Sequence, residues 1–325
     1  MRTLRLSVTE QQAGRTAESL LRGELGVSST LLRKLKQRPM GVALNGERIY
    51  ATARVGAGDT LTADISDDVT GRPGGKAIPL AVLYEDDDLL ILNKPAGMAV
   101  HSSTREPDMD TVEDALYAYL PPDVLPHPVS RLDRGTTGVM TIAKSGYVHE
   151  LLRRRMHTAD FQREYIAIAV GEPPTPSGTA ELPIGFAEGS RYKRAVRENG
   201  APSQTAYETL SSWEGLSLLR IRPLTGRTHQ IRVHMAALGC PLLGDWLYGT
   251  EDIRPTQRNA DVEQCNASVA EQRNAGAEQR NAVAFGIARP ALHSASLRLT
   301  QPVTGETLHI AAPLPEDMRG FGGRM

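Results

Sequence analysis

The stretch from Pro128 to Lys144 constrains the fold most, because it joins a lone carboxylate to a strand that must be buried. It reads Pro-Val-Ser-Arg-Leu-Asp-Arg-Gly-Thr-Thr-Gly-Val-Met-Thr-Ile-Ala-Lys, and its only acid is Asp133. The Gly-Thr-Thr-Gly segment predicts a turn, and the apolar, partly β-branched residues after it predict a buried strand. Asp133 is therefore expected at the mouth of a strand, where loop residues on a rigid scaffold often carry out chemistry.

Two arginines, Arg131 and Arg134, flank this aspartate. A nearby positive charge favours the ionised form of a carboxyl group, so the sequence predicts that they keep Asp133 charged. An ionised and fixed carboxylate can act as a nucleophile, a base or a metal ligand. From these residues alone, a surface turn in which the aspartate pairs with an arginine explains the pattern at least as well.

The motif resembles the catalytic motif of the RluA-type pseudouridine synthases, a family that isomerises uridine within RNA. The resemblance rests on Arg-Leu-Asp, on Gly-Thr-Thr-Gly and on the hydrophobic strand, and other family-like segments follow in order from about residue 80 to 318. It implies that Asp133 is the nucleophile. Ser130 is a departure, since His or Asn often precedes Arg-Leu-Asp in the family.

A second family-like block runs from Leu224 to Gly249 and contains Gly-Arg-Thr-His-Gln-Ile-Arg-Val-His. Two sets of its residues recur at four-residue spacing and predict a helix: Gln230, His234 and Leu238, and Thr228, Arg232 and Ala236. The resemblance to the family's third motif implies that Arg232 pairs with the catalytic aspartate. A bidentate arginine would suit this task, because it orients a carboxylate and keeps it charged.

The resemblance also implies residues that contact RNA. Tyr165, in an apolar strand predicted at 163–171, would stack on the target base, although such a tyrosine is more typical of a core strand. Arg131 would fill the space that the extruded uridine leaves, since a base must leave its stack to be reached. Arg227 and His229 are further RNA-binding candidates. The basic segment 183–197 is predicted to be a loop that either contacts phosphates or is solvated.

No metal or other cofactor is expected. His229 and His234 lie five residues apart, but no carboxylate or third histidine follows at ligand spacing. The cysteines, Cys240 and Cys265, form no Cys-x-x-Cys pair and predict no disulfide framework. The isomerisation that the resemblance implies adds and removes nothing, so it requires no metal or redox group.

Residues 1–66 are expected to form a small RNA-binding module, because residues 14–66 resemble one that is shared with a ribosomal small-subunit protein and often precedes RluA-type catalytic domains. Helices are predicted at 15–25 and 30–38, followed by strands at 42–44 and 61–65. The second helix carries four basic residues that we expect to bind RNA: Arg33, Lys34, Lys36 and Arg38. A small helical cap with a solvated basic face is the alternative.

The rest of the domain organisation follows from composition and from the resemblance. Residues 67–78 are polar and rich in Gly and Pro, which predicts a flexible linker. Residues 79–318 would form the catalytic domain, interrupted by a low-complexity insertion at 250–286, and 319–325 would be a tail. The resemblance implies an α+β pseudouridine synthase fold, with a mixed, mainly antiparallel central sheet and a catalytic cleft. A small α/β module precedes it in the chain.

The function implied is the isomerisation of uridine in structured RNA, with large-subunit ribosomal RNA as the first expectation and transfer RNA as the alternative. A net charge of −1 does not by itself indicate an RNA binder, but residues 215–244 hold four arginines and no acid. No apolar run approaches about 18 residues, so a cytoplasmic monomer without membrane contact is expected. A non-catalytic RNA-binding protein and a glycosidase, which needs two placed carboxylates, are the rival functions.

Overall fold

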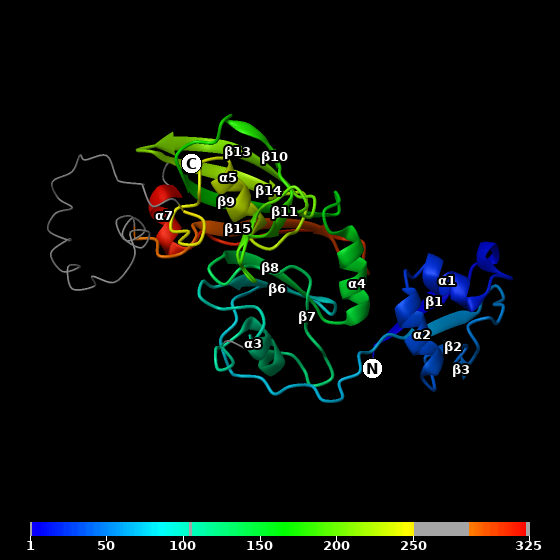
Figure 1. Ribbon diagram of the computed structural model, residues 1–325. Coiled ribbons are helices and arrows are strands. Elements are labelled where there is room, and N and C mark those ends of the chain that lie inside the picture. The colour runs from blue at the N-terminus through cyan, green and yellow to red at the C-terminus, as the bar shows by residue number, and fades with distance from the viewer. Residues whose placement is uncertain (1, 104–105, 250–285, 323–325) are drawn as a thin grey trace.

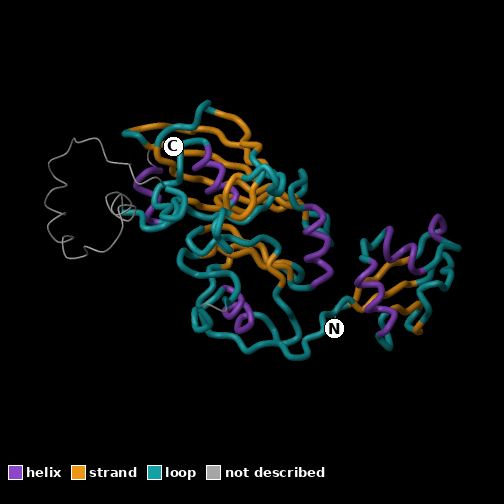
Figure 2. Tube along the Cα trace, in the orientation of Figure 1, coloured by secondary structure: helices purple, strands orange, loops and turns teal. Residues whose placement is uncertain are grey.

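The computed structural model describes residues 2–103, 106–249 and 286–322. Within them the chain forms a four-stranded sheet in residues 3–64, a ten-stranded sheet in residues 82–311 and a two-stranded ribbon (Figures 1 and 2). The pair of β15 with β8 is parallel, and every other strand pair in these ranges is antiparallel. The prediction of an α+β fold with a mixed, mainly antiparallel sheet is confirmed. The insertion predicted at 250–286 lies, except for Gly286, outside the described residues.

The small sheet is covered by two short helices that begin where side chains can cap them. Its strands lie in the order β1 (Thr3–Ser7), β4 (Thr60–Asp64), β2 (Val42–Leu44) and β3 (Glu47–Arg48), with the 3₁₀ turn η1 (Glu10–Gln12) after β1. The helices are α1 (Ala17–Gly23) and α2 (Ser29–Gln37). The side chains of Thr16 and Ser28 accept hydrogen bonds of 3.2 Å from the first turn of each helix. Both predicted helices are confirmed, whereas β1 was not predicted, although its half-buried Leu4 and Leu6 alternate with exposed residues.

The large sheet is built around strands buried on both faces, such as β8. Its strands lie in the order β10 (Ser177–Glu181), β13 (Gln204–Trp213), β14 (Leu216–Pro223), β9 (Phe161–Val170), β15 (Leu292–Thr300), β8 (Thr137–Ala143), β6 (Leu89–Lys94) and β5 (Val82–Glu85). Beside this row, β16 (Thr307–Ala311) pairs with β15 and β7 (His127–Pro128) with β8. Gly138 lets β8 lie against β15, since a Cβ there would come within 2.1 Å of the Ser294 carbonyl oxygen.

The segment predicted to be a basic loop at 183–197 is instead a β-hairpin of β11 (Ile184–Phe186) and β12 (Arg194–Val196). Phe186 and Arg194 face each other across the two strands, and the guanidinium lies 3.6 Å from the ring centroid. Such a cation–π contact between cross-strand neighbours stabilises a short hairpin. The loop prediction was wrong because it counted the charges and not their pairing with an aromatic residue.

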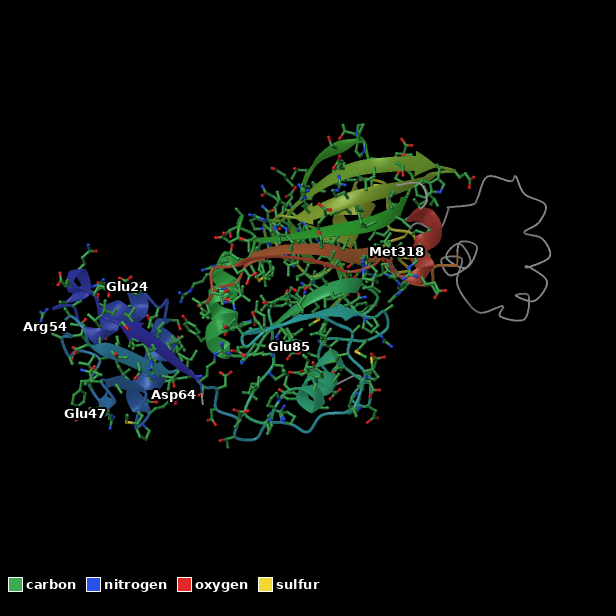
Figure 3. All side chains as sticks on the ribbon, turned by 180° about the vertical axis from the view of Figure 1, so that it is seen from behind. Glu24, Glu47, Arg54, Asp64, Glu85 and Met318 are labelled. Carbon is green, nitrogen blue, oxygen red and sulfur yellow. The ribbon has the colours of Figure 1, made fainter. Side chains whose placement is uncertain are left out.

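Helix α4 (Gly146–Arg155) lies on the side of the large sheet that faces the small sheet (Figures 1 and 3). The hydroxyl of Tyr147 donates to the Leu25 carbonyl at 2.5 Å, and Arg154 donates to the Gly26 carbonyl at 3.1 Å. One apolar cluster contains residues of α1 and α2 together with Val148 and Leu152 of α4. The N-terminal module therefore shares a core with the larger part of the chain. None of the helices in the described ranges is long and apolar enough to cross a membrane.

Residues 67–78 contain no helix or strand, but they are anchored to the larger part rather than free. Asp67 accepts hydrogen bonds from His127 at 2.8 Å and from the Gly146 N–H at 3.0 Å. Arg72 donates to the Tyr117 carbonyl at 2.9 Å, and its guanidinium lies 5.2 Å from the centroid of that ring. The prediction of a flexible linker was wrong, because side chains of this polar segment bond to the end of α3 (Val112–Tyr119) and the start of α4.

Because residues 67–78 are packed against α3, alanine substitutions at the adjacent glycines Gly74 and Gly75 should differ in their effect on stability. A Cβ on Gly75 would lie 2.1 Å from the backbone nitrogen of Ala118, whereas one on Gly74 would meet nothing within 4 Å. We expect Gly75→Ala to lower the free energy of unfolding by about 1–3 kcal/mol, because the segment must move away from α3. Gly74→Ala should change it by no more than about 0.5 kcal/mol. Urea denaturation measures both, and equal values would show that the segment is not packed.

Candidate active site

Asp133 lies in the loop between β7 and β8, where its backbone is fixed and its carboxylate is accessible. Its carbonyl accepts the Thr136 N–H at 3.0 Å, which closes the turn that the Gly-Thr-Thr-Gly segment predicts. Leu132 is buried and anchors the loop in the core. The Asp133 side chain itself is 26% exposed. The structure therefore holds one carboxylate at the mouth of a buried strand.

Helix α5 (Gln230–Ala237) brings the second block to this loop. Gln230 and His234 both bond to the Thr205 hydroxyl, at 3.0 and 2.8 Å, so their shared helix face is confirmed. Thr228 precedes the helix, because His229 is its N-cap and adopts the left-handed conformation with φ 58°. The part of the predicted pattern that placed Thr228 on the helix was therefore wrong.

Arg232 is the residue that joins the two blocks. Its Nη1 donates to Asp133 Oδ2 at 3.1 Å, so the predicted contact is present. Its bidentate partner is a different carboxylate, Asp245, which accepts from Nε at 2.7 Å and from Nη2 at 2.8 Å. Arg232 is 6% exposed and the Asp245 side chain is fully buried. The expected bidentate bond to Asp133 is therefore absent, because Asp245 receives two donors of Arg232 and Asp133 receives one.

This arrangement keeps Arg232 charged although it is buried. Burial alone would lower the pKa of the Arg232 guanidinium, but the hydrogen bonds and charge of Asp245, with a smaller contribution from Asp133, raise that pKa above its ordinary value. A fixed cation therefore stands beside Oδ2 of Asp133 at any pH at which the protein is folded.

The arginines that flank Asp133 do not take part in this pairing. Arg134 donates to the Gly97 carbonyl at 3.0 Å and to Glu106 at 3.2 Å. Arg131 is exposed and makes no hydrogen bond or ion pair with the residues that the structure describes. The prediction that neighbours in sequence hold Asp133 charged was wrong, because the turn directs Arg134 toward another loop while Arg232 arrives from α5.

His229 is the second basic side chain beside the carboxylate. Its Nε2 lies 3.9 Å from Asp133 Oδ2, and its Nδ1 lies 2.8 Å from the Tyr248 hydroxyl. Burial lowers the pKa of His229; the charge of Asp133 opposes this shift and that of Arg232 adds to it. The contacts of Asp133 with Arg232 and His229 both reach Oδ2, and Oδ1 has no hydrogen bond or ion pair with any described residue.

Tyr165 lies beneath this site rather than on its surface. It is 4% exposed, and it belongs to the apolar cluster that also contains Leu132 and Ile231, the sequence neighbours of Asp133 and Arg232. The ring is therefore part of the same apolar core as the loop and the helix that carry the charged pair. Stacking on a base would need ring surface that this conformation covers.

Lys94 is a site residue that the sequence did not reveal. It is 1% exposed, and its ammonium donates to the carbonyls of Pro95 and Met98 at 2.8 Å and of Arg134 at 3.3 Å. Burial lowers the pKa of Lys94 to about 8, although the charge of Asp133 opposes that shift. The apolar strand that ends in Asn-Lys-Pro-Ala-Gly was the available signal, because a lysine at the end of such a strand must find carbonyl partners.

Asp245 and Tyr248 were also missed, and both follow a glycine that the fold requires. Gly244 has φ +73°, and a Cβ there would lie 2.2 Å from the Arg289 carbonyl oxygen. The tight turn after it directs Asp245 inward, where its Oδ1 accepts the backbone N–H groups of Leu247 and Tyr248 at 3.1 and 3.3 Å. Gly-Asp followed by Tyr-Gly in the second block was the sequence signal.

The other predicted RNA contacts are spread over the surface. Arg227 is exposed, and its Nε donates to the Pro202 carbonyl at 3.3 Å.

In the described ranges, no group of three or more His, Cys, Asp or Glu residues is arranged to hold a metal ion.

The four basic residues of α2 divide into two kinds. Lys36 pairs with Glu18 at 2.8 Å, and Arg38 pairs with Asp64 at 3.5 Å. Arg33 makes no hydrogen bond or ion pair in the described part of the chain, and Lys34 has only longer-range attraction to Asp67 and Asp68. Arg33 and Lys34 are therefore the charges that remain available to phosphates.

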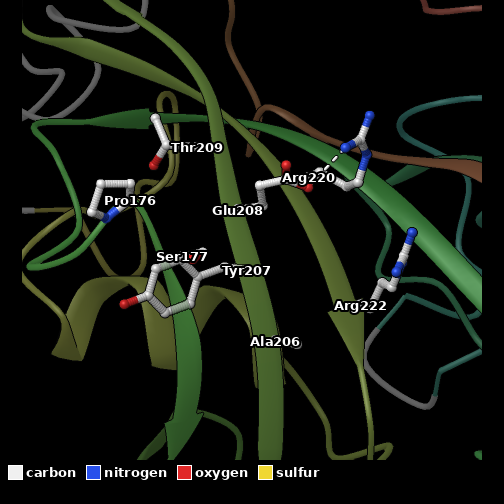
Figure 4. Close-up of a pocket in the computed structure, with 8 residues that line it drawn as sticks. All are labelled: Pro176, Ser177, Ala206, Tyr207, Glu208, Thr209, Arg220 and Arg222. Atoms are coloured by element: carbon white, nitrogen blue, oxygen red, sulfur yellow. Dashed lines mark hydrogen bonds and ion pairs between the residues drawn. The ribbon is translucent and has the colours of Figure 1, made fainter.

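A hollow of about 450 Å³ on β10, β13 and β14 is not part of this site (Figure 4). Arg220 and Arg222 on its wall lie on the sheet face opposite Tyr165 and Ile221, because side chains alternate along each strand. Arg220 pairs with Glu208 at 2.8 Å. Because Arg220 is paired with an acid and the arginines lie on the other face of the sheet, this hollow does not contribute to the site of Asp133.

Comparison with known proteins gives consistent matches. The family model for RNA pseudouridylate synthase matches residues 88–237. A "Ribosomal large subunit pseudouridine synthase D" of Vibrio parahaemolyticus is 35% identical over 94% of this chain and 83% of its own length. The protein of that name from Yersinia pestis is 36% identical over 85% of this chain and 80% of its length. The solved structure of Human RNA Pseudouridylate Synthase Domain Containing 4 covers 75% of this chain and 92% of its own, with 26% identity and a TM-score of 0.53.

The buried pair of Arg232 and Asp245 predicts a large loss of stability when its charge balance is broken. We expect Asp245→Asn to lower the free energy of unfolding by about 3–5 kcal/mol, because it leaves a buried guanidinium without its main counter-charge. Glu106→Gln is the matched control, since its arginine pair is more than half exposed and should contribute less than about 1 kcal/mol. Urea denaturation compares the two, and similar losses would contradict this account.

Proposed function

The chain belongs to the RluA-type family of RNA pseudouridine synthases, and from that membership we propose that its substrate is uridine in large-subunit ribosomal RNA. As a member of the family it is an enzyme that isomerises uridine to pseudouridine in RNA. The relatives that it matches over most of their length are named for the large ribosomal subunit. Transfer RNA is the alternative substrate.

The reaction changes the position of one bond. The bond from N1 of the base to C1′ of the sugar breaks, a bond from C5 to C1′ forms, and a proton leaves C5 while one is added at N1. Atoms and charge balance without a co-reactant. The protein must therefore supply a group that acts on the sugar while the base turns, and it must hold the base outside its stack.

We assign the first task to Oδ1 of Asp133. Oδ2 is held by a buried cation, whereas Oδ1 has no partner in the described part of the chain, and this difference is the observation that carries the proposal. Oδ1 either attacks C1′ or removes a proton from the sugar. Arg232 orients the carboxylate for both routes through its hydrogen bond to Oδ2.

Tyr165 and Arg131 have supporting roles in this proposal. Tyr165 would contact the base only after a rearrangement that uncovers its ring, which is 4% exposed here and packed in the apolar cluster that also contains Leu132. Arg131 is exposed beside the nucleophile and is not engaged within the described residues, so its guanidinium is available to enter the space that the extruded uridine leaves.

A glycosidase would need a second carboxylate near Asp133. The structure has one, Asp245, but its side chain could not react with a substrate. Asp245 shares Arg232 with Asp133, yet its side chain is fully buried and both of its oxygens accept from Arg232. A glycosidase needs two carboxyl groups that reach the substrate from either side of the bond. The single accessible carboxylate favours the isomerase.

Asp133→Asn tests the assignment directly. The change is nearly isosteric and removes the charge, so we expect pseudouridine formation to fall below detection while RNA affinity changes less than about twofold. Asp108→Asn, an exposed aspartate in another loop, is the control and should keep full activity. Turnover by Asp133→Asn at the wild-type rate would remove Asp133 from the mechanism, and a wild-type protein that binds RNA without converting it would support the non-catalytic alternative.

Mapping of pseudouridines in cells that lack the protein tests the substrate. Large-subunit ribosomal RNA should lose specific pseudouridines, which wild-type protein restores and Asp133→Asn does not. Loss confined to transfer RNA would overturn the proposed substrate and leave the assignment of Asp133 intact.

The division of basic residues on α2 gives a prediction for RNA affinity. We expect Arg33→Ala with Lys34→Ala to weaken binding at moderate salt and to reduce the slope of log affinity against log salt by about 1.4 to 1.8, because two phosphate contacts no longer release counterions. Single-turnover rate at saturating RNA should stay at the wild-type value. Arg33→Lys with Lys34→Arg keeps both charges and should leave the slope unchanged. Normal affinity with slow turnover would show that the module shapes the active site instead.

A further inference from the structure

We propose that His229 is a positioning residue of the isomerase, which fixes the reacting carboxylate by donating a hydrogen bond to its Oδ2, and that Tyr248 sets the orientation of this histidine. The inference rests on the proposed role of Asp133. It concerns a line of polar contacts that runs from the β11–β12 hairpin to the carboxylate.

The contacts lead from the hairpin to the carboxylate in three steps, of which the last, at 3.9 Å, is longer than a hydrogen bond. The backbone N–H of Arg194 in β12 donates to the Tyr248 hydroxyl at 3.0 Å. That hydroxyl lies 2.8 Å from His229 Nδ1, and the two rings meet edge to face with centroids 5.7 Å apart. His229 Nε2 then lies 3.9 Å from Asp133 Oδ2. A hairpin strand, a tyrosine, a histidine and the carboxylate thus form one series.

The chemistry of the groups fixes where the hydrogens are. An ionised carboxylate only accepts, so Nε2 of His229 must carry the hydrogen that faces it. In a neutral imidazole Nδ1 is then the acceptor, and burial, which lowers the pKa of His229, keeps the ring neutral at neutral pH. The Tyr248 oxygen accepts from Arg194 and gives its own hydrogen to Nδ1. Each donor in the series then faces an acceptor, and the Nε2–Oδ2 separation of 3.9 Å is the one that must shorten to become a hydrogen bond.

Both donors therefore act on the same oxygen. Arg232 Nη1 lies 3.1 Å from Oδ2 of Asp133 and His229 Nε2 lies 3.9 Å from it, which turns Oδ1 away from both. The longer contact is of the kind that shortens when substrate excludes water from a site. Tyr248 also lies against Arg232, with the guanidinium carbon 5.0 Å from its ring centroid. Tyr248 accordingly contacts both groups that hold the carboxylate.

The left-handed backbone of His229 allows an experiment to distinguish a role of the side chain in positioning Asp133 from a purely structural role of the residue. His229 has φ 58°, a left-handed conformation that Asn adopts more readily than His or Gln. If the position matters only for its backbone, Asn is the gentler replacement. If the Nε2 hydrogen matters, Gln is the gentler replacement, because its amide nitrogen reaches the place of Nε2 and that of Asn does not.

The first experiment compares His229→Gln and His229→Asn in single-turnover pseudouridine formation, with a saturating unmodified large-subunit ribosomal RNA transcript. We expect Asn to slow the reaction by about ten- to a hundredfold, the effect of one lost hydrogen bond to a charged group, and Gln to slow it less than Asn. RNA affinity should be equal in the two variants. A rate with Asn at or above that with Gln would overturn the proposal.

Tyr248→Phe tests the orientation of the ring. It removes the hydroxyl that holds the tautomer, so the rate should fall about tenfold on the wild-type background. On the His229→Gln background it should fall less, since an amide needs no partner to fix its hydrogens. Equal losses on both backgrounds would show that Tyr248 acts independently of His229.

A readout without turnover separates this inference from the proposed function. In the ¹⁵N spectrum of histidine-labelled protein, the resonances that His229→Gln removes should report hydrogen on Nε2, and Tyr248→Phe should shift this population toward Nδ1. Hydrogen on Nδ1 in the wild type would overturn the proposal even in an active enzyme. If the tautomer is as expected but the wild type converts no RNA, the proposed function fails while the hydrogen-bond series stands.

His157 is the matched control for the backbone argument. It also has a positive φ, of 67°, and it has no hydrogen bond or ion pair with Asp133 or Arg232 in the described part of the chain. At this position Asn should give the higher melting temperature, and both His157→Asn and His157→Gln should react at the wild-type rate. The same order of rates at His157 as at His229 would show that the difference between Gln and Asn is a property of left-handed positions and would overturn the proposal.

Discussion

The buried pair of Arg232 and Asp245 is the interaction on which the rest of the site depends. A guanidinium cannot be buried without a counter-charge, and the cost of removing both groups from water is offset only when their hydrogen bonds are complete. Asp245 meets this condition with two bonds to Arg232 and two from the backbone of its own turn. Because Asp245 neutralises Arg232, the remaining Nη1 is available to hold the accessible Asp133 without a further buried charge.

Close approach of backbone segments brings these charges together. Gly138 allows β8, which leads from the loop of Asp133, to lie against β15. Gly244 allows the turn of Asp245 to lie against the carbonyl of Arg289. Arg289 pairs with Asp317 of α7 (Glu316–Gly322) and donates to the Gly135 carbonyl at 3.1 Å, so the C-terminal helix braces the same loop. The site is thus held by the turn of Asp245, which follows α5, and by Arg289, which precedes β15.

The sequence predicted what depends on local pattern and missed what depends on contacts between distant segments. Asp133 at the mouth of a buried strand, and the helix face of Gln230 and His234, follow from turn residues and periodicity. The contact of Arg232 with Asp133 was expected only from the family resemblance, because it depends on how α5 packs, and the bidentate bond to Asp245 was missed for the same reason. The segment 67–78 was misjudged for the same reason, since its composition describes its solubility and not the bonds that Asp67 and Arg72 make to other elements.

The N-terminal module and residues 67–78 are both bonded to the larger part of the chain, which fixes the position of the module. Tyr147 and Arg154 of α4 bond to the loop between α1 and α2, and Asp67 bonds to His127 immediately before the motif that contains Asp133. RNA held by Arg33 and Lys34 would therefore be held by a body that shares a core with the catalytic sheet, not by a domain on a tether. In a tethered arrangement, binding by the module would only raise the local concentration of RNA. In a docked one the module binds RNA at a fixed place relative to the catalytic sheet, which contributes to affinity, while the groups around Asp133 set the rate once the RNA is bound.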